Sequence, residues 1–87
     1  MTENPYAGLQ QKLDEQYQWP TQYLFKFIVP ESKKEELEAL FPRDEVSSRY
    51  SKNGNYVSLT AQVLVESSQA VIDVYRKAHA IEGTIGL

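Results

Sequence analysis

Few side chains in this 87-residue chain could carry out chemistry. There is no cysteine and one histidine, His79, which has no evident nucleophile or second metal ligand to act with. We expect His79 to be structural, at the C-terminal end of a helix, where a partial positive charge suits the helix dipole. Glu35, Glu36 and Glu38 fall near the N-terminus of an expected helix and indicate a solvated helix face. The sequence therefore predicts no enzyme, no metal site and no cofactor.

The clearest structural signal is the pair Asn53-Gly54, which lies between two segments that alternate apolar and polar residues. Such a pair predicts a β-hairpin with a type I′ turn, because that turn needs positive φ at both central positions. A two-residue turn at Asn53 and Gly54 sets the register of a hairpin from about Asp44 to Val65. A bulge beside Gly54 is the alternative, and it would shift that register. The expected pairs include Tyr50 with Val57, Arg49 with Ser58, and Val46 with Ala61.

This register divides the sheet into two faces, because successive strand residues point to opposite sides. One face is mostly apolar and is expected to be covered by helices: Phe25, Phe27, Val29, Val46, Tyr50, Val57, Leu59, Ala61, Val63, Val65 and Ile85. The other face is expected to be open, with Leu24, Ile28 and Leu64 flanking its polar residues: Lys26, Ser47, Arg49, Ser51, Tyr56, Ser58, Thr60 and Gln62.

The open face is where we place a candidate binding surface, formed by Lys26, Arg49, Ser51, Tyr56, Ser58 and Thr60. Lys26 and Arg49 would orient a partner by charge, and Tyr56 would anchor it. Ser58 and Thr60 would supply hydrogen bonds. The alternative is that these hydroxyl groups are only solvated strand residues, because antiparallel sheets commonly leave one face to water.

The remaining elements follow from periodicity and capping signals. The run Thr21 to Val29 predicts a central strand with apolar residues on both faces. Ser32-Lys33-Lys34-Glu35 reads as a capping box for a helix that ends at Pro42 and buries Leu37, Leu40 and Phe41. Ser67 or Ser68 would cap a second helix, with Val71, Val74, Tyr75 and Ala78 on its apolar stripe. Gly83 to Leu87 would form a short last strand.

Residues 1–20 form an N-terminal extension that is glutamine-rich and has few β-branched residues. Asn4-Pro5 reads as an N-cap and first helical position, and Leu9, Leu13 and Tyr17 recur every fourth residue, which predicts a helix over about residues 5–17. A helix this short is marginal alone. Trp19 would either hold the extension on the domain or anchor a partner protein.

The order strand, helix, strand, strand, helix, strand over residues 21–87 predicts a ferredoxin-like α+β domain. Right-handed crossovers give a four-stranded antiparallel sheet of order 4-1-3-2, with both helices on one face. The net charge of -3 argues against nucleic acid, and no apolar run approaches the ~20 residues that span a membrane. The start Met-Thr-Glu-Asn-Pro lacks the features of a signal peptide, so we expect the cytoplasm.

Three parts of the chain resemble the YbeD-like family of small bacterial proteins of unknown function. They are the strand Phe25-Lys26-Phe27-Ile28-Val29, the hairpin from Ser51 to Thr60, and a closing helix followed by a short strand. Trp19-Pro20-x-x-Tyr23 resembles one branch of that family, and this chain carries an extra residue, Asn53, in the hairpin turn. The resemblance implies a ferredoxin-like fold similar to ACT regulatory domains, a cytoplasmic location and no established activity.

Four functions are weighed on this fold. The favoured one is an interaction or regulatory module that binds another protein or a second copy of itself. An ACT-type amino-acid sensor is the alternative, although the loop Val29-Pro30-Glu31-Ser32 lacks the glycine that would let backbone amides approach a carboxylate. RNA binding of the RNA-recognition-motif type would leave only Tyr56 to stack on bases. An acylphosphatase would need an arginine and glycines in the same loop, which has neither.

Overall fold

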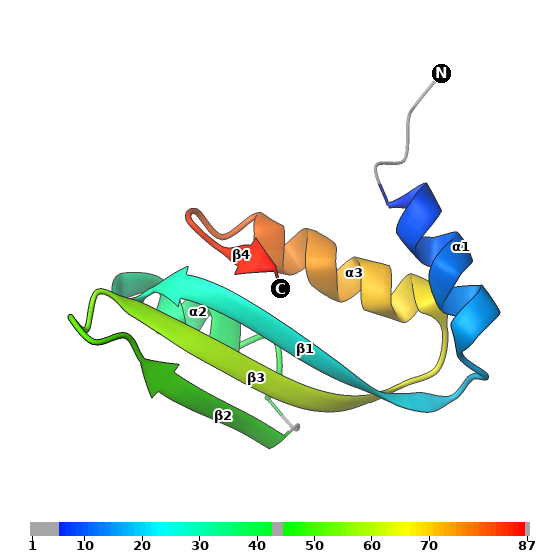
Figure 1. Ribbon diagram of the computed structural model, residues 1–87, viewed down its shortest axis with the longest axis horizontal. Helices are drawn as coiled ribbons and strands as arrows, with labels where there is room; N and C mark the ends of the chain where they lie inside the picture. Colours follow the sequence, from blue (N-terminus) through cyan, green and yellow to red (C-terminus); the bar gives the residue numbers. More distant parts are fainter. Residues whose placement is uncertain (1–5, 43–44, 87) are drawn as a thin grey trace.

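The computed structural model describes residues 6–42 and 45–86 as an α+β protein with an open antiparallel sheet (Figure 1). The described part contains three α-helices and four strands, with one 3-10 turn (η1) between β1 and α2. In chain order these are α1 (Ala7–Gln16), β1 (Thr21–Pro30), η1 (Glu31–Lys33), α2 (Lys34–Glu38), β2 (Glu45–Tyr50), β3 (Tyr56–Val65), α3 (Ser68–His79) and β4 (Ile85–Gly86).

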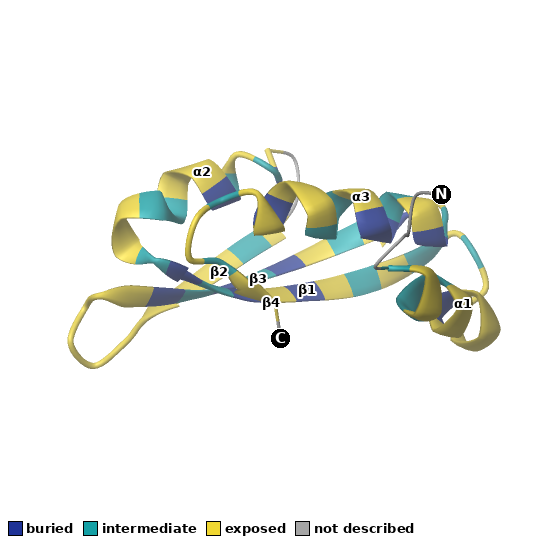
Figure 2. Ribbon diagram, turned by 90° about the horizontal axis from the view of Figure 1, so that it is seen from above, coloured by how far each residue is buried: buried dark blue, intermediate teal, exposed yellow. Residues whose placement is uncertain are grey.

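The strands lie in the order β2-β3-β1-β4, and each neighbouring pair is antiparallel. Counted from the β4 edge this order reads 4-1-3-2, with the two longest strands, β1 and β3, in the centre. α2 and α3 lie over one side of the sheet, whereas α1 lies at one end of it (Figure 2). No described element covers the opposite side of the sheet, which we call the open face.

The hairpin register is confirmed, but the predicted turn type is wrong. The pairs Tyr50 with Val57 and Arg49 with Ser58 form as expected. The Gly54 amide donates to the Ser51 carbonyl at 2.9 Å, which makes Lys52 and Asn53 the central residues of the turn. Only Gly54 in this turn has a positive φ, of 75°, so Asn53 does not take the type I′ conformation.

The hairpin register is the same for the predicted and the observed turn. The loop 52–55 and a two-residue turn at 53–54 have the same midpoint. Both therefore bring the same strand residues opposite each other, and the pairing runs without a bulge from Glu45 opposite Gln62 to Tyr50 opposite Val57. The position of Asp44, the expected start of the hairpin, lies outside the described residues.

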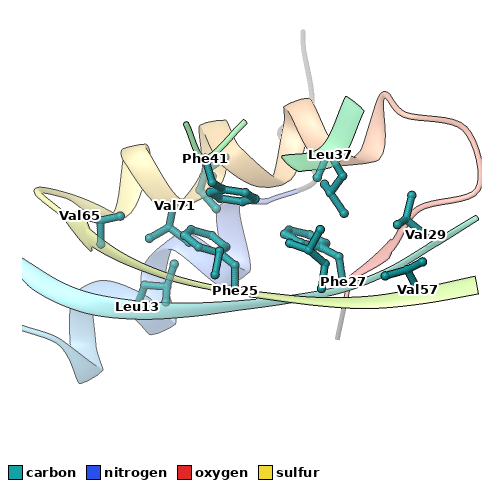
Figure 3. Close-up of a cluster of buried hydrophobic side chains, with 13 residues drawn as sticks. Leu13, Phe25, Phe27, Val29, Leu37, Phe41, Val57, Val65 and Val71 are labelled. Carbon is teal, nitrogen blue, oxygen red and sulfur yellow. The ribbon is translucent and has the colours of Figure 1, made fainter. Parts of the chain in front are cut away.

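The core lies between the sheet and the two helices that cover it (Figure 3). Phe25 and Phe27 of β1 are fully buried, and both contact the rings of Phe41 and Tyr75. Centroid distances of 5.5–6.5 Å are in the range in which aromatic pairs attract each other. The buried apolar residues are Leu13, Phe25, Phe27, Val29, Leu37, Phe41, Val57, Leu59, Ala61, Val65, Val71, Ile72 and Ala78.

The two predicted helix starts had different outcomes. Ser67 is the N-cap of α3, and its Oγ accepts a hydrogen bond from the Ala70 amide at 3.1 Å. The capping box at Ser32 is wrong: Ser32 lies inside η1, and neither η1 nor α2 has a side-chain capping bond. An N-cap residue has an extended backbone, and Ser32 does not have one because it lies inside the 3-10 turn. α2 is consequently a helix of only five residues.

The N-terminal helix packs on the domain. Leu13 is 4% exposed and belongs to the shared core, and the Trp19 indole donates to Asp14 at 3.0 Å. The Tyr6 hydroxyl lies 2.8 Å from Nδ1 of His79, at the other end of the chain. Trp19 is also partly buried against this core. The predicted N-cap at Asn4 and Pro5 lies outside the described residues.

The last strand is the clearest correction to the assignment of faces. Ile85 was expected on the covered face, but it pairs with Ile28 on the open face and is 56% exposed. Gly86 is the residue opposite Phe27 on the covered side. A Cβ at Gly86 would lie 3.3 Å from Nε2 of His79, which is a tight contact with the side chain of a residue at the end of α3.

Candidate functional site

The open face of the sheet brings the polar residues of three strands side by side. Lys26 of β1 lies opposite Thr60 of β3, and Thr60 lies opposite Ser47 of β2. The next row contains Ile28 on β1, Ser58 on β3 and Arg49 on β2. Because the side chains in each row come from paired positions on neighbouring strands, they form one continuous surface.

Three adjoining hollows lie along β2 and β3 on this surface. The first, of about 340 Å³, is lined by Ser47, Ser48, Arg49, Ser58 and Thr60. The second, also about 340 Å³, is lined by Ile28, Arg49, Tyr50, Ser51, Tyr56 and Ser58. The third, about 210 Å³, is lined by Leu24, Glu45, Ser47, Thr60 and Gln62. Since neighbouring hollows share lining residues, we treat them together as the open-face groove.

The groove changes character along its length. Its Tyr56 end is apolar, because Ile28 and the tyrosine rings line it. Its middle is polar, with hydroxyl groups around Arg49. Its far end carries Glu45, with Leu24 beside it at 51% exposure. A ligand along the groove would therefore meet an apolar, a cationic and an acidic region in turn.

Five of the six predicted binding residues line the groove: Arg49, Ser51, Tyr56, Ser58 and Thr60. Lys26 is exposed on the same face, next to Thr60, but does not line any of the three hollows. Ser51 also has a local role, because its Oγ accepts a hydrogen bond from the Tyr56 amide at 3.2 Å. This bond is consistent with a structural function for Ser51 in the hairpin.

Two residues that line the groove, Ser48 and Tyr50, were not expected on the open face. Both have the parity of the covered face, but β2 is an edge strand, and its residues are reachable from the side. Tyr50 is 52% exposed, and the ammonium group of Lys34 lies 5.6 Å from its ring centroid. The hydrogen bond to Glu38 raises the pKa of Lys34.

Several other chemistries find no support in the described residues. No group of three histidine or acidic side chains in residues 6–42 and 45–86 could hold a metal ion. The Glu31 amide, at the loop where an ACT-type ligand would bind, donates to the Asn55 carbonyl at 2.9 Å. Phe25 and Phe27 are fully buried and unable to stack on bases. His79 stacks between Tyr6 and Tyr75, with centroid distances of 6.1 and 6.0 Å.

No helix in the described part of the chain is long and apolar enough to cross a membrane.

Comparison with known proteins identifies a family for most of this fold. No curated protein and no solved structure matches the chain. The matching family model covers residues 14–85, from the last turns of α1 to the first residue of β4, and includes every strand that forms the open face. The chain belongs to the family described as protein of unknown function, DUF493.

Proposed function

We propose that this chain is a ferredoxin-like binding module that takes a segment of another protein on the open face of its sheet, without catalysis. The observation that carries the proposal is the open-face groove, in which three hollows share lining residues along β2 and β3. The face of an antiparallel sheet that only contacts water is typically polar. This face instead combines hollows, exposed aliphatic side chains and a central cation.

Arg49 and Tyr56 would contribute most of the binding energy. Arg49 lines two of the three hollows, and no ion pair joins it to a described residue. Tyr56 is 49% exposed at the apolar end. Arginine and tyrosine are enriched among the residues that dominate protein interfaces. The hydroxyl groups of Ser58 and Thr60 lie between the ends of the groove and would bond to the backbone of the bound segment.

The shape and charge of the groove favour an extended segment. The groove follows the strand direction, so a bound chain would lie along β2 and β3. An apolar side chain would occupy the Tyr56 end, and a carboxylate would pair with Arg49, with Lys26 adding to the positive potential. Glu45 at the far end would disfavour a second acidic group there.

The resemblance to YbeD-like proteins and to ACT regulatory domains supports the ferredoxin-like assignment and a regulatory role in the cytoplasm. Fold alone does not give function, so the proposal depends on the groove.

The test is capture of partners by the tagged full-length chain from a lysate, read by quantitative mass spectrometry. The double variant Arg49→Ala/Tyr56→Ala should lose the partners that the unaltered chain retains. The matched control Lys77→Ala/Glu82→Ala changes two exposed residues outside the sheet and should retain them. The full chain is needed because removal of α1 would take Leu13 out of the core. Equal capture by all three proteins would contradict the proposal.

A further inference from the structure

The outer edge of β2 is available for pairing with another strand. β2 ends the sheet on one side, and no described element lies beyond it (Figure 1). Proteins usually protect such an edge with a proline, a bulge, a covering segment or charged side chains, and the two charged side chains of this edge, Glu45 and Arg49, have opposite signs. The strand Glu45–Tyr50 contains no proline or glycine, and its pairing with β3 has no bulge.

The backbone groups that point outward from this edge can be assigned. The Ser51 amide donates to the Tyr56 carbonyl at 2.8 Å, so the Ser51 backbone faces β3. In an antiparallel ladder the direction alternates with each residue. Val46, Ser48 and Tyr50 therefore direct their amide and carbonyl groups away from β3, toward the solvent.

This alternation restricts how a second copy could pair with the edge. When two antiparallel β2 strands are related by a two-fold axis, residues that point outward must lie opposite each other. One residue therefore lies opposite its own copy, and we describe the axis as passing through that residue. An axis through Ser47 places Val46 opposite Ser48 of the second copy. It also places Glu45 opposite Arg49 of the second copy, and this pairing occurs twice.

The other allowed registers lack that complementarity. An axis through Ser48 places Arg49 opposite Ser47 of the second copy, and an axis through Arg49 places the two arginines opposite each other. Like charges at opposed positions destabilise a sheet, and opposite charges stabilise it. Glu45 and Arg49 are exposed, and neither forms an ion pair with a described residue. The register through Ser47 is thus the one that pairs these free charges.

We propose that two copies of this chain associate by antiparallel pairing of their β2 strands about Ser47, with two Glu45–Arg49 ion pairs between the copies. The pairing would form a continuous eight-stranded sheet with both open faces on one side. It does not depend on the proposed function, because it rests on the exposed edge of β2 and on the pairing of Glu45 with Arg49 between the copies, and not on a segment bound in the groove.

The opposite edge of the sheet is a poorer site for the same contact. β4 pairs with only Phe27 and Ile28 of β1, and α1 lies at the end of the sheet where β1 begins. An axis through Leu24 would place Gln22 opposite Lys26, without a charge pair. The β2 edge is therefore the one at which the sequence is complementary to itself.

Sedimentation velocity of the purified full-length chain, in a concentration series to about 1 mM, tests the proposal; the range is chosen because a single strand pair buries little area. The unaltered chain should dimerise. Glu45→Arg and Arg49→Glu should each weaken the dimer by about 10- to 100-fold, since each places like charges opposite each other. The control Glu82→Arg, with the same charge change as Glu45→Arg but on a loop, should dimerise normally.

The two charge variants also test the register directly. Mixed in equal amounts, Glu45→Arg and Arg49→Glu should form a heterodimer, because every opposed pair in the Ser47 register is then complementary. The double variant Glu45→Arg/Arg49→Glu should dimerise with itself. Residues four apart on a strand are about 13 Å apart, so this rescue cannot come from an ion pair within one copy.

Ser48→Pro tests the backbone contact without changing Arg49 or Tyr56, the two residues expected to contribute most of the binding energy in the open-face groove. It removes an outward amide without removing a hydrogen bond to β3, and it leaves the side chains of Arg49 and Tyr56 in place. We expect a folded monomer, with circular dichroism as the check on folding. A monomeric unaltered chain at every concentration, or a dimer indifferent to the charge variants and to Ser48→Pro, would overturn the proposal.

Discussion

The two faces of the same sheet differ in how closely their side chains are packed. On the covered face, Phe25 and Phe27 have no exposed surface and contact the rings of Phe41 and Tyr75. On the open face, the alternating residues Leu24 and Lys26 are exposed, and hollows separate the side chains of the neighbouring strands. Stability is therefore concentrated on one side of the strands, and the proposed binding surface lies on the other.

The largest expected effect comes from a pair of neighbours on β1. Phe27→Ala should lower the free energy of unfolding by about 3–5 kcal/mol, because it leaves a cavity in a packed aromatic cluster. Lys26→Ala, one residue away on the open face, should change it by less than about 0.5 kcal/mol. Urea denaturation followed by circular dichroism measures both. Similar losses in the two variants would contradict the separation of the faces.

The next effect concerns the residues that place β4. Gly86→Val should cost about 1–3 kcal/mol, because its side chain would meet His79 and Tyr75 on the covered face. Ile85→Val, on the open face, should cost less than about 0.5 kcal/mol, since the side chain is already more than half exposed. Thermal unfolding compares the two. If Ile85→Val were the more damaging change, the assignment of Ile85 to the open face would be wrong.

Two serines give a smaller contrast. Ser67→Ala should lower the free energy of unfolding by about 1 kcal/mol, because the Ala70 amide loses its side-chain acceptor at the start of α3. Ser47→Ala removes an exposed hydroxyl from the open face and should be almost neutral. Chemical denaturation under identical conditions provides the comparison, and a neutral Ser67→Ala would show that the cap contributes nothing.

The smallest expected effect is a dependence of the free energy of unfolding on pH in the alkaline range. Burial, together with a 3.2 Å hydrogen bond to the Tyr23 hydroxyl, raises the pKa of Tyr75. The unfolded chain then loses the Tyr75 proton at a lower pH than the folded chain does. This contribution to stability is complete below about pH 10 and declines as the pH rises above it. Tyr75→Phe should flatten that decline, and an unchanged slope of stability against pH would contradict it.

The strands were predictable from the sequence because the alternation of apolar and polar residues within each strand indicates which face each residue occupies. Alternation along β1, β2 and β3 assigned Phe27 to the core and Arg49 to the open face. The turn was assigned to the wrong type, yet its midpoint at 53–54 was right, and the midpoint alone sets the register. The sequence did not predict whether α1 packs on the domain, because Leu13 and Tyr6 contact residues that are distant in the sequence.

The errors concern features that depend on the assembled structure and not on the local sequence. Ile85 alternates correctly with its neighbours, but its pairing partner was unknown, and the observed register places Gly86 opposite Phe27 on the covered side. Ser32 has the sequence context of an N-cap, but it lies inside a 3-10 turn. Tyr50 joins the groove because β2 is at an edge. Such features require the assembled sheet.

The most direct test of the open face as a binding surface is site-specific photo-crosslinking in cells that express the full-length chain. Benzoylphenylalanine would replace Tyr56 in the groove and, in a second variant, Lys77 on the exposed side of α3. The account predicts a discrete crosslinked partner band at position 56 that is absent at position 77. Crosslinking confined to position 77, or equal at both positions, would contradict it.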